Sequence, residues 1–306
     1  MTVNRRAFLK LAAGASGTLV ASRASANAVA SNSGVEPFGV LVDTTFCIGC
    51  RKCELGCNQN NRDLPRRDSP QFEDKRVFDT HRRPDATSYT VINRLPTVDT
   101  KGEPVFAKAQ CMHCVHPACA SACIVGALQK TPEGPVTYDA WKCIGCRYCM
   151  VACPFQIPAY EYANALTPQV RKCTFCYEQI VTQGSRPGCV ANCPNEALTF
   201  GKRSELIELA HAKIATHRER YIDHVYGETE IGGTSFMYLS AVDFKALDLP
   251  EQGDTPTPAL TEKIQHGVFK GFVPPVALYG LLGLVYLSRR KEEVENTAAD
   301  KDEHHE

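Results

Sequence analysis

CIGCRYCMVACP at residues 143–154 places four cysteines in the spacing C-x2-C-x2-C-x3-C, and CIGCRKCELGC at 47–57 repeats that spacing. Two further groups have related spacings: CMHCVHPACASAC at 111–123, and a wider group at 173–193. All 16 cysteines of the chain belong to these groups, which we number one to four along the chain (47–57, 111–123, 143–153 and 173–193). The chemistry of the four groups therefore decides the fold.

The repeated spacing is that of bacterial ferredoxins, in which the fourth cysteine of a group ligates the other cluster. Disulfides are expected outside the cytoplasm, but cysteines this crowded suit a metal centre better. Zinc normally takes two knuckles separated by a loop, and a redox C-x-x-C pair would not recur with two more cysteines each time. We therefore predict four 4Fe-4S clusters.

The flanking segments indicate which groups share a fold unit. Short alternating strands at 39–46 and 134–142 precede groups one and three, whereas strands follow groups two and four. Residues 131–134, Thr-Pro-Glu-Gly, predict a hairpin turn between groups two and three. We therefore expect groups two and three to form one contiguous ferredoxin unit. By elimination, groups one and four form a second unit, split around the first.

The swapped fourth cysteine then yields four ligand sets. Set A is Cys47, Cys50, Cys53 and Cys193; set B is Cys173, Cys176, Cys189 and Cys57; set C is Cys111, Cys114, Cys119 and Cys153; set D is Cys143, Cys146, Cys149 and Cys123. Because the cysteines already supply all four sets, we expect His113 and His116 to pack or hydrogen-bond rather than ligate. Trp141 and Tyr148 would shield a cluster or pack in the core, and Lys142 and Lys172 would be solvated.

The first 26 residues have the pattern of an export signal. NRRAFLK at 4–10 precedes a mild apolar run at 11–20, and Ala24-Ser25-Ala26 is a candidate cleavage site. Ten apolar residues are too few for a membrane span, and twin arginines are typical of the pathway that exports folded proteins. A short amphipathic helix is the alternative. Export after folding would allow clusters to be inserted in the reducing cytoplasm, so we expect the folded part in the periplasm.

A second apolar stretch, GFVPPVALYGLLGLVYLS at 271–288, contains no charged residue and is followed by Arg289-Arg290-Lys291. Its length suffices for a membrane span, and the basic cluster indicates a cytoplasmic tail. A buried helix of a soluble core is the alternative. We expect one transmembrane helix, without quinone or proton chemistry inside it, that anchors the protein on the periplasmic side of the bacterial inner membrane.

The predicted fold class is α+β: two bacterial-type dicluster ferredoxin units, one inserted in the other, plus a C-terminal transmembrane helix. Within the insertion we expect one strand at 89–95, and after the last cysteine an amphipathic helix at 204–225 and a strand at 236–242. The predicted domains are a signal peptide (1–26), the split unit (38–57 plus 173–203), an insertion (58–110), the contiguous unit with a linker (111–172), an extension (204–266), the transmembrane helix (270–288) and a tail (289–306).

Composition excludes several function classes. Lys and Arg number 34, as do Asp and Glu, so the chain has no net charge and is not a general nucleic-acid binder. The sequence shows neither a Ser/His/Asp set nor a phosphate loop, and no G-x-G-x-x-G follows a strand. We therefore expect a non-catalytic electron carrier rather than an enzyme.

The whole chain resembles the HybA-type four-cluster ferredoxin subunit of periplasm-facing nickel–iron uptake hydrogenases. The segments that carry the resemblance are QCMHCVHPAC (110–119), CIGCRYCMVACPFQIPAYEY (143–162), RPGCVANCPNEALTFGKRSEL (186–206), VYGETEIGGT (225–234), LDLP (247–250) and IQHGVFKG (264–271). The cysteine core alone is shared with the β subunits of molybdenum-dependent formate dehydrogenases and several anaerobic reductases. Ile124 and Asn58 stand where proline is frequent after the fourth cysteine, a preference of the fold rather than a ligand position.

The resemblance implies electron transfer through four clusters. The implied partners are the small iron–sulfur subunit of a hydrogenase, through it the large subunit, and an integral membrane subunit that reacts with quinone. One alternative is the β subunit of a formate dehydrogenase or other molybdopterin oxidoreductase. Another is an anchored zinc or structural cysteine module, which metal and acid-labile sulfide analysis would distinguish.

Overall fold

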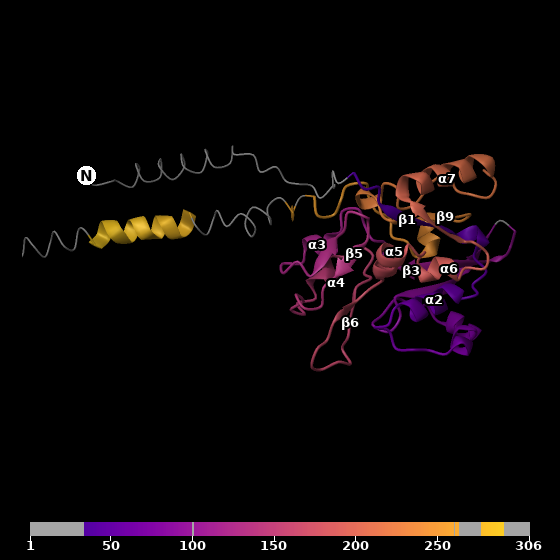
Figure 1. Cartoon of the computed structure of the whole chain (residues 1–306). Coiled ribbons are helices and arrows are strands. Elements are labelled where there is room, and N and C mark those ends of the chain that lie inside the picture. Colours follow the sequence, from indigo (N-terminus) through magenta and orange to yellow (C-terminus); the bar gives the residue numbers. More distant parts are fainter. Residues whose placement is uncertain (1–33, 100, 260, 263–276, 291–306) are drawn as a thin grey trace, which may run out of the picture. The chain divides into compact units, whose positions relative to one another are not determined.

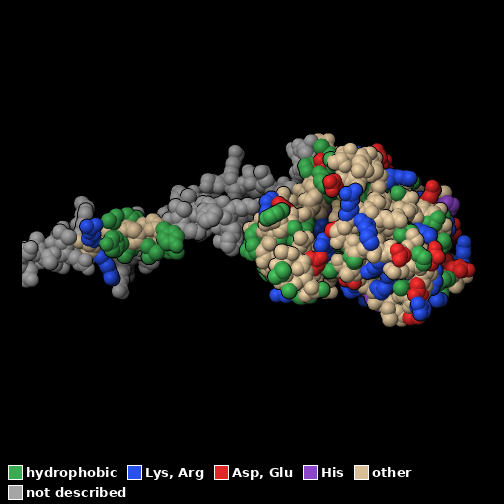
Figure 2. Space-filling view, turned by 60° about the horizontal axis from the view of Figure 1, so that its bottom comes forward, with side chains coloured by type: hydrophobic (Ala, Val, Ile, Leu, Met, Phe, Trp, Pro, Cys, Tyr) green, Lys and Arg blue, Asp and Glu red, His purple; other side chains and the backbone are tan. Residues whose placement is uncertain are grey.

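The computed structural model describes residues 34–99, 101–259, 261–262 and 277–290 (Figure 1). The predicted signal peptide at 1–26 lies outside the described residues, as do residues 263–276 and 291–306. The chain divides into two compact units, Ala28–Pro258 and Met1–Asn27 with Ala259–Glu306. All sixteen cysteines belong to the first unit, in which acidic and basic side chains are interspersed on the face shown in Figure 2.

A three-stranded sheet joins the beginning and end of the cysteine region. It has the order β8-β1-β9, formed by β8 (Leu198–Lys202), β1 (Phe38–Asp43) and β9 (Phe236–Leu239). β1 runs antiparallel to β8, with Val40 opposite Phe200, and parallel to β9. The strand before group one thus pairs with the strand after group four, although more than 150 residues separate them in sequence.

The two faces of this sheet bury different partners, because successive strand residues point to opposite sides. On one face Leu41 packs against α7 (Arg203–Thr216), which buries Leu206, Ala210 and Ile214. On the other face Val40 and Val42 join a core that contains cysteines of groups one, two and four. The sheet therefore separates α7 from the cysteine core.

The contiguous segment from group two to group three contains the predicted hairpin. β4 (Leu128–Lys130) pairs antiparallel with β5 (Val136–Tyr138). The helices of the two groups, α3 (Ala118–Ser121) and α4 (Tyr148–Ala152), contact each other. A two-stranded ribbon of β6 (Ala159–Tyr160) and β7 (Val170–Arg171) leads on to group four.

The helices of groups one and four pack in the same way. α2 (Lys52–Asn60) contacts α6 (Gly188–Ala191). In sequence, α5 (Tyr177–Gln183) lies within group four, after its second cysteine and before its third. Gly56 and Gly188 face each other: a β-carbon on Gly56 would lie 2.3 Å from the Gly188 carbonyl oxygen. Only residues without a side chain permit this close approach.

Residues 58–110 contain more structure than the sequence predicted. β2 (Thr90–Val98), which includes most of the expected strand, pairs antiparallel with β3 (Pro104–Gln110). The 3-10 helices η2 (Ser69–Phe72) and η3 (Lys75–Asp79) precede this hairpin, and η1 (Thr44–Phe46) follows β1. β3 was not predicted because its alanine, lysine and glutamine residues have weak strand propensity.

Two predicted elements after the last cysteine end earlier than expected. α7 stops at Thr216 rather than near 225, and β9 stops at Leu239 rather than at 242. The chain leaves the helix at His217 and returns to the sheet, where the Ile222 N–H donates to the Ser240 carbonyl at 2.9 Å. The short helices η4 (Glu230–Gly232) and η5 (Phe244–Leu247) complete this region.

Of the predicted transmembrane segment, residues 277–288 are described and belong to a helix that continues to 290; residues 270–276 lie outside the description. Within the ranges that the structure describes, we find no helix both long and apolar enough to cross a membrane.

Candidate metal centres

The four cysteine groups share one backbone feature. The residue directly before the second cysteine has a positive φ in every group: Gly49 (64°), His113 (47°), Gly145 (69°) and Phe175 (61°). Turns with left-handed residues direct backbone N–H groups into concavities of the kind that hold phosphates and iron–sulfur clusters. The shared geometry therefore suits an anionic cluster in each loop.

Groups one and three match most closely. In both, a second left-handed residue, Arg51 or Arg147, follows the second cysteine and is the N-cap of α2 or α4. In group one the glycine of the loop is also required by space, because a β-carbon at Gly49 would lie 2.4 Å from the Phe106 ring. The identical turns extend the internal repeat from the sequence to the backbone.

Some N–H groups already donate to cysteine sulfur. The Phe175 N–H contacts Cys173 Sγ at 3.3 Å, and the Ala127 N–H contacts Cys123 Sγ at 3.2 Å. Such donors favour the negatively charged form of a thiol, which is the form that binds iron.

One thiol from each predicted set shows which cysteines are neighbours. Burial, together with adjacent cysteines, raises the pKa of each of these thiols, to about 11 for Cys47 and Cys149. The neighbours are Cys50 and Cys193 for Cys47; Cys173, Cys189 and Cys176 for Cys57; Cys111, Cys119 and Cys153 for Cys114; and Cys123, Cys143 and Cys146 for Cys149. These neighbours are members of the same predicted set.

The donor chemistry fits iron–sulfur clusters. All sixteen cysteines are free of disulfide bonds. Thiolates buried this close together repel one another, so each set needs a cationic centre before its thiols ionise. All four members of set A line a single cavity. Among the described residues, no three Cys, His, Asp or Glu side chains converge as the ligands of one metal ion would.

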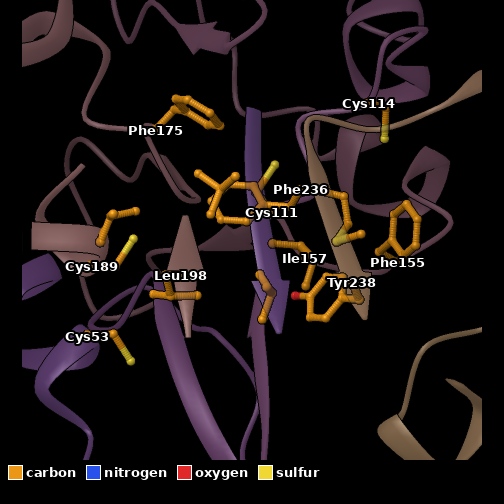
Figure 3. Close-up of a cluster of buried hydrophobic side chains, with 14 of the residues drawn as sticks. Cys53, Cys111, Cys114, Phe155, Ile157, Phe175, Cys189, Leu198, Phe236 and Tyr238 are labelled. Atoms are coloured by element: carbon orange, nitrogen blue, oxygen red, sulfur yellow. The ribbon is translucent and has the colours of Figure 1, made fainter. Parts of the chain in front are cut away.

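One buried core contains cysteines of sets A, B and C (Figure 3), and a second contains Cys119 of set C together with cysteines of set D. Cys53 of set A and Cys189 of set B both belong to this core, and the charge of Cys189 raises the pKa of Cys53. Cys173 of set B is in turn next to Cys111 of set C, and Cys119 of set C is next to Cys149 of set D. These electrostatic influences link the predicted sets in the order A, B, C, D.

His113 has the hydrogen-bonding role that the sequence predicted. Its side chain is fully buried, and its Nδ1 accepts a hydrogen bond from the Val136 N–H at 2.9 Å. Burial, together with the charges of Lys172 and Lys130, holds the pKa of His113 well below its usual range. The ring is neutral and braces group two against the hairpin.

Lys172 contradicts its prediction. We expected a solvated side chain, but Lys172 is buried and its Nζ donates to the carbonyls of Val136 and Cys173. The fold of the hairpin over group four creates this environment. Lys142, by contrast, is exposed as predicted and pairs with Asp139 at 3.2 Å.

Trp141 and Tyr148 also correct their prediction. Neither packs in the core, because the two residues are 98% and 59% exposed. Ile124, Ile144 and Val151 are likewise exposed, and all five flank the cysteines of set D. We call these five residues the set D face. Figure 2 shows hydrophobic side chains along the edge of the folded body at which Figure 1 places α3 and α4.

Sequence reasoning missed Lys108, which β3 carries into the core. Its side chain is buried, and it lines the same cavity as the four cysteines of set A. Burial by itself would lower the pKa of Lys108, but Cys189 and Cys53 outweigh it, so the pKa lies above its usual range. No sequence signal identifies this lysine, since only the β2–β3 pairing places it beside the cysteines.

Comparison with known proteins agrees with these features. Residues 103–203 match the family model for a 4Fe-4S dicluster domain, which covers groups two, three and four. The chain is 38% identical over 340 residues to the hydrogenase-2 operon protein HybA of Escherichia coli O157:H7, spanning 99% of this chain and 98% of the relative.

Two further relatives cover most of the chain. A protein of Nitratidesulfovibrio vulgaris is 46% identical over 300 residues, 95% of this chain and 79% of the relative. The iron–sulfur subunit of the nitrate-inducible formate dehydrogenase of Escherichia coli is 32% identical over 285 residues, 87% of this chain and 89% of the relative. With its sixteen cysteines, the chain binds 4Fe-4S clusters.

Proposed function

Since the chain belongs to the family of iron–sulfur electron-transfer subunits that includes HybA and the formate dehydrogenase iron–sulfur subunits, we propose that it conducts electrons through four 4Fe-4S clusters. Its partners are a periplasmic nickel–iron hydrogenase, reached through the small subunit, and a membrane subunit that reacts with quinone. The observation that carries this proposal is the arrangement of sixteen cysteines in four groups, each with a left-handed residue directly before its second cysteine.

The chain's own residues hold and insulate the clusters. A bound 4Fe-4S cluster supplies reversible one-electron chemistry. The cysteine thiolates of sets A to D ligate iron, and the left-handed turns direct N–H groups toward the sulfur atoms. Eight of the cysteines are buried, which excludes water and limits the reorganisation that accompanies a change of charge.

The order of neighbouring sets supports one route through the protein. Electron tunnelling slows steeply with distance, so transfer follows the closest pairs. Those pairs are Cys53 with Cys189, Cys173 with Cys111, and Cys119 with Cys149. We propose that electrons pass along the clusters in the order A, B, C, D or its reverse.

The set D face supports contact with a redox partner at that end of the route. Cys146 of set D is exposed, and exposed apolar side chains flank it. Apolar surface gathered in this way is typical of protein interfaces. A partner subunit that covered it would bring its own redox centre close to set D.

The helix at 277–290 supports a membrane anchor. Leu278, Leu282 and Leu284 are each more than half exposed, and Arg289 and Arg290 end the helix. We propose that the stretch at 270–288 spans the bacterial inner membrane, with the cysteine unit on the periplasmic side after twin-arginine export. Extraction of membranes at high pH tests this: an anchored chain stays in the pellet, whereas a peripheral one is released.

The experiment that tests the function uses the native complex, extracted anaerobically in mild detergent. Its visible absorbance and electron paramagnetic resonance are recorded before and after addition of hydrogen, with formate as the parallel reductant. Reduction by hydrogen alone supports the hydrogenase proposal. Reduction by formate alone favours the second candidate, a formate dehydrogenase subunit. This candidate is supported by the 32% identity, over 87% of the chain, to the formate dehydrogenase iron–sulfur subunit. The absence of any reducible iron–sulfur signal would refute both.

A further inference from the structure

Lys108 is a buried charge without an acidic partner. It lies on β3 with only 4% of its surface exposed. Its Nζ donates to two neutral oxygens, Thr90 Oγ1 at 2.8 Å and Gln110 Oε1 at 2.9 Å. Within the described part of the chain, no carboxylate forms an ion pair with it. Burial of an ammonium group is costly unless a negative charge compensates it.

A closed ring of hydrogen bonds holds the lysine in place. Lys108 Nζ donates to Gln110, the Gln110 amide donates to Tyr238 Oη at 2.6 Å, and Tyr238 Oη donates to the Lys108 carbonyl at 2.7 Å. The Nζ also lies 5.3 Å from the centre of the Phe236 ring. These contacts fix the position of the charge and provide no anion for it.

The cysteines supply what the ring lacks. Lys108 lines the cavity formed by all four members of set A. Its side chain therefore lies beside the thiols of set A, where its positive charge can act on a cluster that they hold.

From this geometry we infer that Lys108 is a potential-setting residue, a fixed positive charge beside the cluster of set A that raises the reduction potential of that cluster. The inference rests on the proposed function, since it assumes that set A holds a cluster. A cluster that accepts one electron gains one negative charge, and no bond or proton need move. A buried cation stabilises the reduced form more than the oxidised form, so it makes reduction easier.

The test is a redox titration of the complete membrane complex, followed by electron paramagnetic resonance. The neutral variants Lys108→Gln and Lys108→Met remove the charge, and Lys108→Met also keeps the packing on Phe236. Lys108→Arg keeps the charge. Thr90→Val is the matched control, because it removes a hydrogen bond from the same buried group and leaves the charge in place. Cys149→Ser identifies the signal of set D, the internal reference.

We expect both neutral variants to move one of the four reduction steps, that of set A, to more negative potential and to leave the set D step unchanged. Lys108→Arg and Thr90→Val should stay close to the unmodified protein. The inference is overturned if four clusters are present and no step moves, or if the arginine and valine variants move the same step equally. If the unmodified protein contains no iron and no acid-labile sulfide, the proposed function is refuted instead, so the two failures are distinguishable. Should one neutral variant fail to assemble, the other decides.

Discussion

Glu54 on α2 offers the sharpest test of how the split unit is held together. The carboxylate is 4% exposed and accepts hydrogen bonds from Arg51 at 2.8 Å, from Arg82 at 2.7 Å and from the Ile92 N–H at 2.8 Å. Burial by itself would raise the pKa of Glu54, but Arg82 and Arg51 outweigh it and hold that pKa below its usual value. The residue thus links the cysteine-bearing helix to the insertion.

Glu54→Ala leaves the buried Arg51 guanidinium without its anion. Removal of one partner from a buried ion pair costs about 3–5 kcal/mol, a large share of the ~5–15 kcal/mol by which a native protein is stable. We therefore expect a reduction of about that size in the free energy of unfolding. Glu54→Gln retains the shape but not the charge and should lose less.

The assay is anaerobic denaturation in urea, followed by far-ultraviolet circular dichroism and by the cluster absorbance. Where unfolding is irreversible, the unfolding rate replaces the midpoint. Glu73→Ala is the matched control. Glu73 pairs at 3.5 Å with Lys52, which lies on α2 as Glu54 does, but both side chains of this pair are exposed. The substitution should therefore lower the free energy of unfolding by less than ~1 kcal/mol. Equal effects of the two alanine substitutions would refute the reasoning.

The pH dependence follows from the same contacts. Because the pKa of Glu54 is lower in the folded chain than its usual value of 4.5, the stability from the ionised carboxylate is fully present above that pH. It is lost as the pH falls through the folded-state pKa. Glu54→Gln should therefore flatten the acid side of the stability profile, and an unchanged profile would contradict this account.

Three further predictions concern the clusters and their partner. Cys53→Ser should alter the centre that also depends on Cys193, and Cys57→Ser the one that depends on Cys173; spectroscopic changes in one and the same centre would show the swapped ligand pairing to be wrong. Gly188→Val should prevent the contact of α6 with α2, because a β-carbon would lie 2.5 Å from the Gly56 carbonyl oxygen; we expect loss of iron from the split unit, and full iron content would contradict it. Trp141→Ser should weaken co-purification of the partner but change the unfolding free energy by less than ~0.5 kcal/mol; intact assembly would exclude the set D face as the contact.

Local spacing made the cluster loops predictable. The C-x2-C-x2-C-x3-C pattern and its glycines specify a turn within a few residues, and the hairpin between groups two and three needs only its turn residues and two short strands. Both features depend on neighbours in sequence. α7 was predicted for the same reason, but its end was not, because the return of Ile222 to Ser240 is a tertiary contact.

Burial of single side chains was less predictable. Lys172 was expected in solvent and is buried, whereas Trp141 was expected against a cluster or core and is exposed. Residue type sets only an average tendency to be buried. Which lysine enters the core depends on strands and loops from distant parts of the chain, so a single sequence does not contain that information in local form.

The sequence by itself determined that the chain holds four cysteine quartets and that their loops suit iron–sulfur clusters, because thiol spacing and turn geometry are local properties. The tertiary structure decided which side chains surround the cysteines. β1 pairs with β8 across the whole cysteine region, and β3 carries Lys108 into the cavity of set A. These arrangements arise from the burial of apolar surface between segments far apart in sequence, which acts on the folded chain as a whole.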